Sequence, residues 1–127
     1  MSRFLVPVGL LLFAAPLAAQ GTDSLPTGVT APTIAEGKKV FAGPGLCGAC
    51  HGPAGKGITG LGPNLTDAEW LHSDGSLEAL VAQITAGVPS SKSKSGVAMP
   101  AKGGGPLTDA QLRAVAAYVW SLSHAAK

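Results

Sequence analysis

Two cysteines and a histidine within five consecutive residues restrict this chain more than any other feature. The segment Cys47-Gly48-Ala49-Cys50-His51 holds both cysteines of the 127-residue sequence. A pair at this spacing suits a thiol redox site, half of a zinc site or a small disulfide loop. With the histidine that follows, it also suits covalent attachment of haem. The rest of the sequence has to distinguish these four possibilities.

The remaining residues favour haem. A zinc site needs four ligands, and His72 and His124 do not form a second closely spaced pair. A thioredoxin-like dithiol expects a neighbouring βαβ pattern, which the sequence lacks, and a disulfide across two residues would constrain little of the unfolded chain. Two thiols at this spacing can instead form thioethers with one porphyrin, so that the next residue faces the iron. We therefore predict one covalent haem c held by Cys47 and Cys50, with His51 as proximal ligand.

The sixth iron ligand is predicted to be a methionine. The sequence has two methionines, and Met99 is the one that follows the initiator. It lies in an irregular Gly- and Pro-rich segment, where no helical face needs an apolar filler. A haem with His and Met ligands has a raised reduction potential and suits electron transfer. The alternatives are His72, which would give a bis-histidine haem, and an open sixth position.

Two further residues complete the predicted cofactor site. A proximal histidine normally donates its second ring N–H to a carbonyl or carboxylate. Pro63 is the candidate for that carbonyl, although it could serve only to turn the chain. Trp70 is either a core residue or the donor of an indole N–H to a haem propionate.

Helical signals are separated by long irregular segments. Capping patterns and apolar periodicity predict helices from Thr33 to residues 43–45, within 64–72, from Ser76 to Gly87, and from Thr108 to about Ser123. No alternating pattern of useful length predicts a strand. We predict an all-α fold of three to five helices, with long loops wrapped around one haem.

The N-terminal part of the chain is predicted to lie outside this domain. Residues 1–20 combine a basic start, an apolar run of roughly 14 residues and small residues, which is typical of a secretory signal peptide. Residues 21–32 resemble a flexible leader, and residues 33–127 form the single predicted domain. The net charge of +2 gives no basic footprint for nucleic acid.

With these features the sequence resembles the class I c-type cytochromes. The resemblance runs from about residue 33 to 122 and rests on Gly37 with Phe41, the Cys47–His51 motif, Gly62-Pro63-Asn64-Leu65, Met99-Pro100-Ala101, and Val115 to Val119. It implies a cytochrome c-like fold in which the first and last helices cross at the glycine and the aromatic residues. It also implies that the Pro63 carbonyl supports the proximal histidine.

Residues 62–72, which include Trp70-Leu71-His72, more specifically resemble the haem domains of the third subunit of cbb3-type cytochrome oxidases. That subunit carries two such domains and a membrane helix. This chain has one haem motif and no spanning segment in the predicted mature part, so membership of that complex is not inferred from the resemblance. Residues 90–95 look inserted relative to shorter family loops, which leaves the path toward Met99 open.

The function expected from these features is that of a single-haem electron carrier exported to the bacterial periplasm. It would not be an enzyme, and it would act as a monomer with redox protein partners: an oxidase, a bc1-type complex or a dehydrogenase. Neither nucleic acid nor a spanning membrane helix is expected. The alternative is a haem sensor or enzyme for a small gas or peroxide, in which a labile sixth ligand opens the iron.

Overall fold

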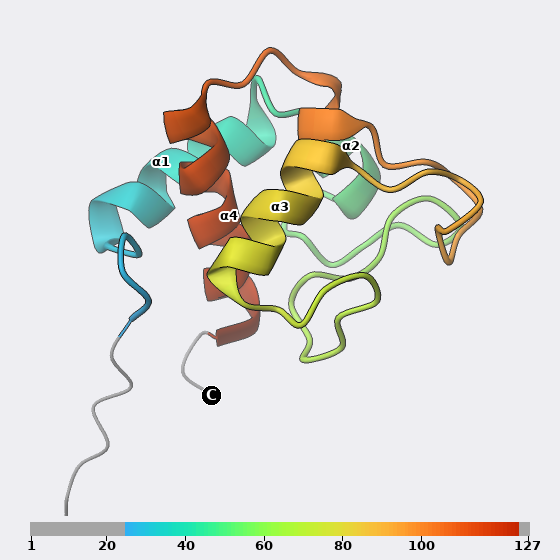
Figure 1. The fold of residues 1–127 in the computed structure, drawn as a ribbon, viewed down its shortest axis with the longest axis horizontal. Coiled ribbons are helices and arrows are strands. Elements are labelled where there is room, and N and C mark those ends of the chain that lie inside the picture. The colour runs from blue at the N-terminus through green and yellow to red at the C-terminus, as the bar shows by residue number, and fades with distance from the viewer. Residues whose placement is uncertain (1–24, 125–127) are drawn as a thin grey trace, which may run out of the picture.

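A computed structural model describes residues 25–124, so the predicted signal peptide lies outside the described residues. The elements are α1 (Ala31–Ala42), α2 (Gly48–His51), α3 (Leu77–Ala86), the 3₁₀ turn η1 (Ala101–Gly104) and α4 (Asp109–His124), as Figure 1 shows. Over this range there is no β-strand, only two isolated bridges. The predicted all-α class is therefore confirmed. No helix in the described range has the length and apolarity needed to cross a membrane.

Helix α1 begins earlier than the sequence pattern predicted. Thr30, not Thr33, is the N-cap, and its hydroxyl oxygen accepts the Thr33 N–H at 3.3 Å. A proline occupies the first turn, where the missing N–H costs nothing. Val29 just before the cap is only 3% exposed. The helix predicted from Thr33 therefore starts at Ala31, and Val29, which lies in the predicted leader of residues 21–32, packs into the core.

Helices α1 and α4 form the main interhelical contact of the domain (Figure 1). At their crossing Gly37 leaves room for the α4 backbone, since a Cβ there would lie 2.6 Å from the carbonyl carbon of Ala114. One turn further along, the rings of Phe41 and Tyr118 meet edge to face with centroids 5.3 Å apart. Val115 is fully buried nearby. The helix crossing implied by the family resemblance is thus confirmed.

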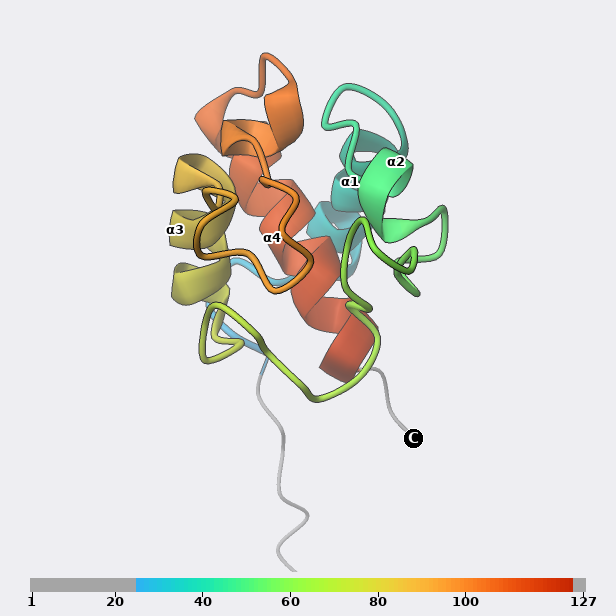
Figure 2. The same cartoon turned by 90° about the vertical axis from the view of Figure 1, so that its right-hand side faces the viewer.

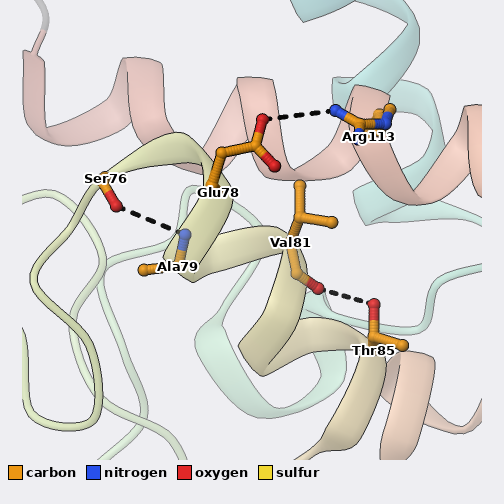
Figure 3. A network of polar contacts seen from close by, with 6 residues as sticks. All are labelled: Ser76, Glu78, Ala79, Val81, Thr85 and Arg113. Atoms are coloured by element: carbon orange, nitrogen blue, oxygen red, sulfur yellow. Dashed lines mark hydrogen bonds and ion pairs between the residues drawn. The ribbon is translucent and has the colours of Figure 1, made fainter.

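The start predicted for α3 at Ser76 and the capping box predicted for α4 are both present. The Ser76 hydroxyl oxygen accepts the Ala79 N–H at the start of α3 (Figure 3), and Thr108 and Gln111 form a reciprocal capping box before α4. Figure 3 also shows the ion pair between Glu78 and Arg113, which joins the two helices at 3.4 Å. Both of its side chains are mostly exposed, so it contributes little to stability.

The short helix predicted within residues 64–72 does not form. Side-chain oxygens of Asn64 and Asp67 instead accept the N–H two residues ahead, and Asp74 does the same just beyond this segment. Asn and Asp side chains compete in this way with helical hydrogen bonds. The segment is therefore a chain of tight turns that carries the polypeptide past the mouth of the cavity described below.

Candidate functional site

All six predicted cofactor-binding residues line one cavity. The space it encloses, counted with its open mouth, is about 1050 Å³. Its lining is mostly apolar and comes from the ends of α1 and α2, the 61–72 segment, α3, the loop before η1, and α4. The six residues are Cys47, Cys50, His51, Pro63, Trp70 and Met99.

The two thiols lie on one helical turn at the cavity wall. Cys47 is the N-cap of α2 and Cys50 lies within it, and both side chains are half-buried and free of a disulfide. The Cys47 thiol donates to the Gly45 carbonyl oxygen at 3.3 Å. Burial raises the pKa of the Cys47 thiol above its ordinary value, and the neighbouring Cys50 adds to that rise. Both cysteines line the same cavity from one helical turn, as double attachment to one molecule requires.

His51 is held with one ring nitrogen available to the cavity. The side chain is 8% exposed, and its Nδ1 lies 2.9 Å from the carbonyl oxygen of Pro63. A carbonyl only accepts, so Nδ1 must donate and carry the proton. The lone pair then resides on Nε2, which is the tautomer that a metal ligand needs. The hydrogen bond predicted from the sequence is present.

The Pro63 carbonyl is fixed in place by close packing of its loop on α2. The Gly57 N–H donates to the His51 carbonyl oxygen at 2.8 Å. A Cβ at Gly62 would lie 2.8 Å from the carbonyl carbon of Cys50, so only glycine permits this approach. The Pro63 carbonyl oxygen, which accepts the hydrogen bond from His51, is thus positioned by backbone contacts and not by the Pro63 side chain.

Met99 reaches the same cavity from the other end of the fold. Its backbone forms an antiparallel bridge with Val88, with both N–H···O distances at 2.8 Å. Gly87 adopts a φ of +72°, and a Cβ there would lie 2.8 Å from the Ala101 nitrogen. Residues 90–95, which the sequence suggested are inserted, therefore lie in a loop whose two ends are joined by this bridge. The Ser95 hydroxyl donates to the Leu61 carbonyl oxygen at 3.1 Å.

Two residues left open by the sequence also line the cavity. Trp70 is half-buried, packs against the core, lies over Gly75 and lines the cavity, a position that fits both of its predicted roles. His72, the alternative sixth ligand, is half-buried in the same lining. Of these two candidate ligands, Met99 has its backbone bridged to Val88, two residues beyond the end of α3.

Sequence reasoning missed two residues at this site. Gln83 lines the cavity, and its buried Oε1 has no hydrogen-bond partner. Its signal was a polar residue between Leu80 and Ile84, on the apolar face of a helix. Leu46 also lines the cavity and is 56% exposed, with a left-handed φ of 55° that no sequence pattern announces.

The donor set fits haem c. It combines two thiols one turn apart, a buried imidazole with a fixed tautomer and a thioether, all facing one largely apolar cavity. Residues 25–124 offer no cluster of three or more His, Cys, Asp or Glu side chains that could hold a bare metal ion. The two thiols, the imidazole and the thioether together suit an iron porphyrin.

Comparisons with known proteins agree with this site. The family model described as Cytochrome c matches residues 34–123. The CcoP subunit of the cbb3-type cytochrome c oxidase of Rhodobacter capsulatus is 42% identical over 93 residues, which are 68% of this chain and 28% of that protein. CcoP of Rubrivivax gelatinosus is 37% identical over 91 residues, 68% of this chain and 25% of that protein. FixP of Azorhizobium caulinodans is 40% identical over 92 residues, 72% of this chain and 30% of that protein.

The chain thus spans less than a third of the length of these relatives. Their names agree with the resemblance to the third subunit of cbb3-type oxidases found in residues 62–72. The match to the family model covers most of the described residues and includes both thiols, His51 and Met99. This chain therefore belongs to the cytochrome c family, whose members bind haem c covalently.

Proposed function

We propose that this chain is an exported single-haem electron carrier that passes one electron at a time between respiratory partners and catalyses no bond-making reaction. The observation that carries the proposal is the joint position of His51 and Met99 in the lining of the thiol-bearing cavity. A carrier needs both axial positions of its iron occupied by protein, because an open position would bind small ligands.

The roles of the residues follow from their chemistry. Cys47 and Cys50 tether the cofactor through thioethers, His51 binds iron through Nε2, and Met99 binds it through its sulfur. Pro63 keeps the imidazole oriented, and Trp70 either packs beside the cofactor or donates its indole N–H to a propionate. When bound, haem c supplies a one-electron iron couple.

The way the two ligands are supported favours electron transfer over binding of gases or peroxide. His51 is fixed by the Pro63 carbonyl, and Met99 by its backbone bridge to Val88. Figure 2 shows α2 on one side of α4 and α3 on the other, so the two ligands depend on separate elements. Ligands held rigidly in this way stay bound in both oxidation states, which keeps reorganisation small.

The relatives suggest the kind of partner. CcoP and FixP are named as subunits of cbb3-type cytochrome c oxidase, and we propose that this chain exchanges electrons with an oxidase of that kind on the periplasmic side of the membrane. The exposed apolar side chains of Leu46 and Val97 line the cavity, and the exposed side chain of Ile58 lies three residues before Leu61 of the same lining. A small contact there would suit a short-lived encounter of a monomer with its partner.

Met99→Ala tests the ligand assignment. The variant should keep its covalent haem but lose the weak far-red sulfur-to-iron band of the ferric protein, and its ferrous form should bind carbon monoxide. Ser90→Ala is the matched control, because it lies in the same loop but outside the cavity lining. An unchanged far-red band in Met99→Ala would remove this residue from the ligand set.

The carrier function is tested separately with the unmodified protein. Reduced, haem-loaded protein should be reoxidised by membranes that contain a cbb3-type oxidase, and cyanide should stop the reaction. Rapid carbon monoxide binding by the unmodified ferrous protein would instead support the alternative of a sensor or enzyme with a labile sixth ligand.

A further inference from the structure

One buried polar atom in the described part of the chain lacks a partner. Among side-chain nitrogen and oxygen atoms of residues 25–124, the buried Oε1 of Gln83 has no hydrogen bond. Leaving a buried amide group unpaired costs about 1–3 kcal/mol. Gln83 lies in α3 and faces the cavity that also holds Met99. Its partner is therefore expected among the groups that come together when the cofactor is bound.

Met99 and Gln83 are joined through a short stretch of backbone. The Gly87 N–H donates to the Gln83 carbonyl oxygen at 2.7 Å, and the next residue, Val88, forms the bridge with Met99. Gln83 therefore lies in the last turn of α3, which leads directly to the backbone bridge between Val88 and Met99. Figure 1 shows the 89–100 loop extending outward from the C-terminal end of α3 and turning back toward η1.

The orientation of the Gln83 side-chain amide decides whether it presents a hydrogen-bond donor or an acceptor. Turning the last side-chain bond exchanges Oε1 and Nε2, so the group can present N–H donors at the orphaned position. The thioether of Met99 is an acceptor, and it keeps a free lone pair after it binds a metal. A propionate would be a poor partner here, because the neighbours of Gln83 on the cavity face of α3 are Leu80 and Ile84, and a carboxylate among them would lose its hydration.

We propose that Gln83 is a positioning residue whose side-chain N–H donates to the sulfur of Met99 when that sulfur is an iron ligand. This inference rests on the proposed ligation by Met99. The positive end of the N–H dipole beside the sulfur opposes the extra charge of ferric iron, which raises the reduction potential. The same bond restrains the sulfur and slows its replacement by external ligands.

Gln83→Leu in the haem-loaded protein tests this role. Removing a hydrogen bond worth about 0.5–1.5 kcal/mol should lower the equilibrium constant for reduction by up to about tenfold, which is about 59 mV for one electron. The affinity of the ferric protein for added imidazole should rise by a similar factor. Thr85→Val is the matched control, because it removes the Thr85 to Val81 hydrogen bond on the outer face of the same helix (Figure 3).

The direction of the potential shift separates this role from a merely structural one. Replacing a polar side chain by leucine without loss of a bond to the ligand makes the cavity less polar, which favours ferrous iron and raises the potential. A raised or unchanged potential in Gln83→Leu, with unchanged imidazole affinity, overturns the role of Gln83. If Gln83→Leu does not accumulate, Gln83→Met, which keeps the unbranched chain, is measured in its place.

Failure of the underlying ligation gives a different result. A far-red band in the unmodified protein, with Gln83→Leu behaving like Thr85→Val, rejects only the hydrogen bond to Met99. Absence of that band in the unmodified protein rejects both Met99 as ligand and the role of Gln83.

Discussion

Replacing Gly37 by alanine tests whether the crossing of α1 and α4 depends on the missing side chain. A Cβ at this position would lie 2.6 Å from the carbonyl carbon of Ala114 and 2.7 Å from the Cβ of Tyr118. Non-bonded carbon atoms pack at about 3.5–4.0 Å, so the two helices would have to separate by about 1 Å. That movement would loosen the edge-to-face contact of Phe41 with Tyr118.

The expected magnitude follows from two opposing effects. Overpacking of a filled core costs typically 1–3 kcal/mol, and the upper end applies here because the obstacle includes backbone atoms. Alanine is better than glycine in a helix interior by about 1 kcal/mol. The net expectation is a loss of about 2 kcal/mol in the free energy of unfolding.

Equilibrium unfolding of the haem-loaded protein in guanidinium chloride, followed by helical circular dichroism, measures this loss. Ala35→Gly is the control, because Ala35 is exposed in the same helix and should report the propensity effect alone. That variant should lose about 1 kcal/mol. The reasoning is refuted if Gly37→Ala is more stable than the unmodified protein, since only helix propensity would then matter at the crossing.

Two further substitutions test the support of Met99 and the behaviour in acid. Gly87→Ala places a Cβ against the Met99–Ala101 backbone at a φ of +72°, so it should weaken the far-red band and increase imidazole binding; a band of full strength would contradict the anchoring. Hydrogen bonds from Ser76 hold the pKa of Asp74 below its ordinary value, so this carboxylate stabilises the fold above its unfolded pKa and loses that contribution as the pH falls through its folded pKa. Asp74→Ala should therefore be less stable than the unmodified protein at neutral pH, and the gap should narrow in acid; a constant gap measured by thermal unfolding would argue against this account.

Local patterns in the sequence were enough to predict several elements. The thiol and histidine spacing predicted the attachment motif, and the caps at Ser76 and Thr108 placed the start of α3 and α4. These features depend on residues within one or two turns of each other, which is why they can be read from the chain. The all-α class followed from the same periodicity.

Patterns that compete locally gave wrong boundaries. Thr33 and Thr30 could both cap α1, and the burial of Val29 favours Thr30. In the 64–72 segment, turns closed by the side chains of Asn64 and Asp67 replaced the predicted helix. Helix propensity alone could not decide between the two caps, or between a helix and turns. The choice depends on contacts with the rest of the core and on hydrogen bonds from nearby backbone N–H groups to side chains.

The sequence by itself determined which chemical groups this chain brings to a cofactor: two thiols, an imidazole and a thioether. Only the tertiary structure decided that they face one cavity, and that the buried Oε1 of Gln83 in the lining of that cavity has no hydrogen-bond partner. The physical reason is that a ligand set depends on distances between segments far apart in the chain. Those distances are set by the α1–α4 crossing and by the bridge between Val88 and Met99, which no local pattern encodes.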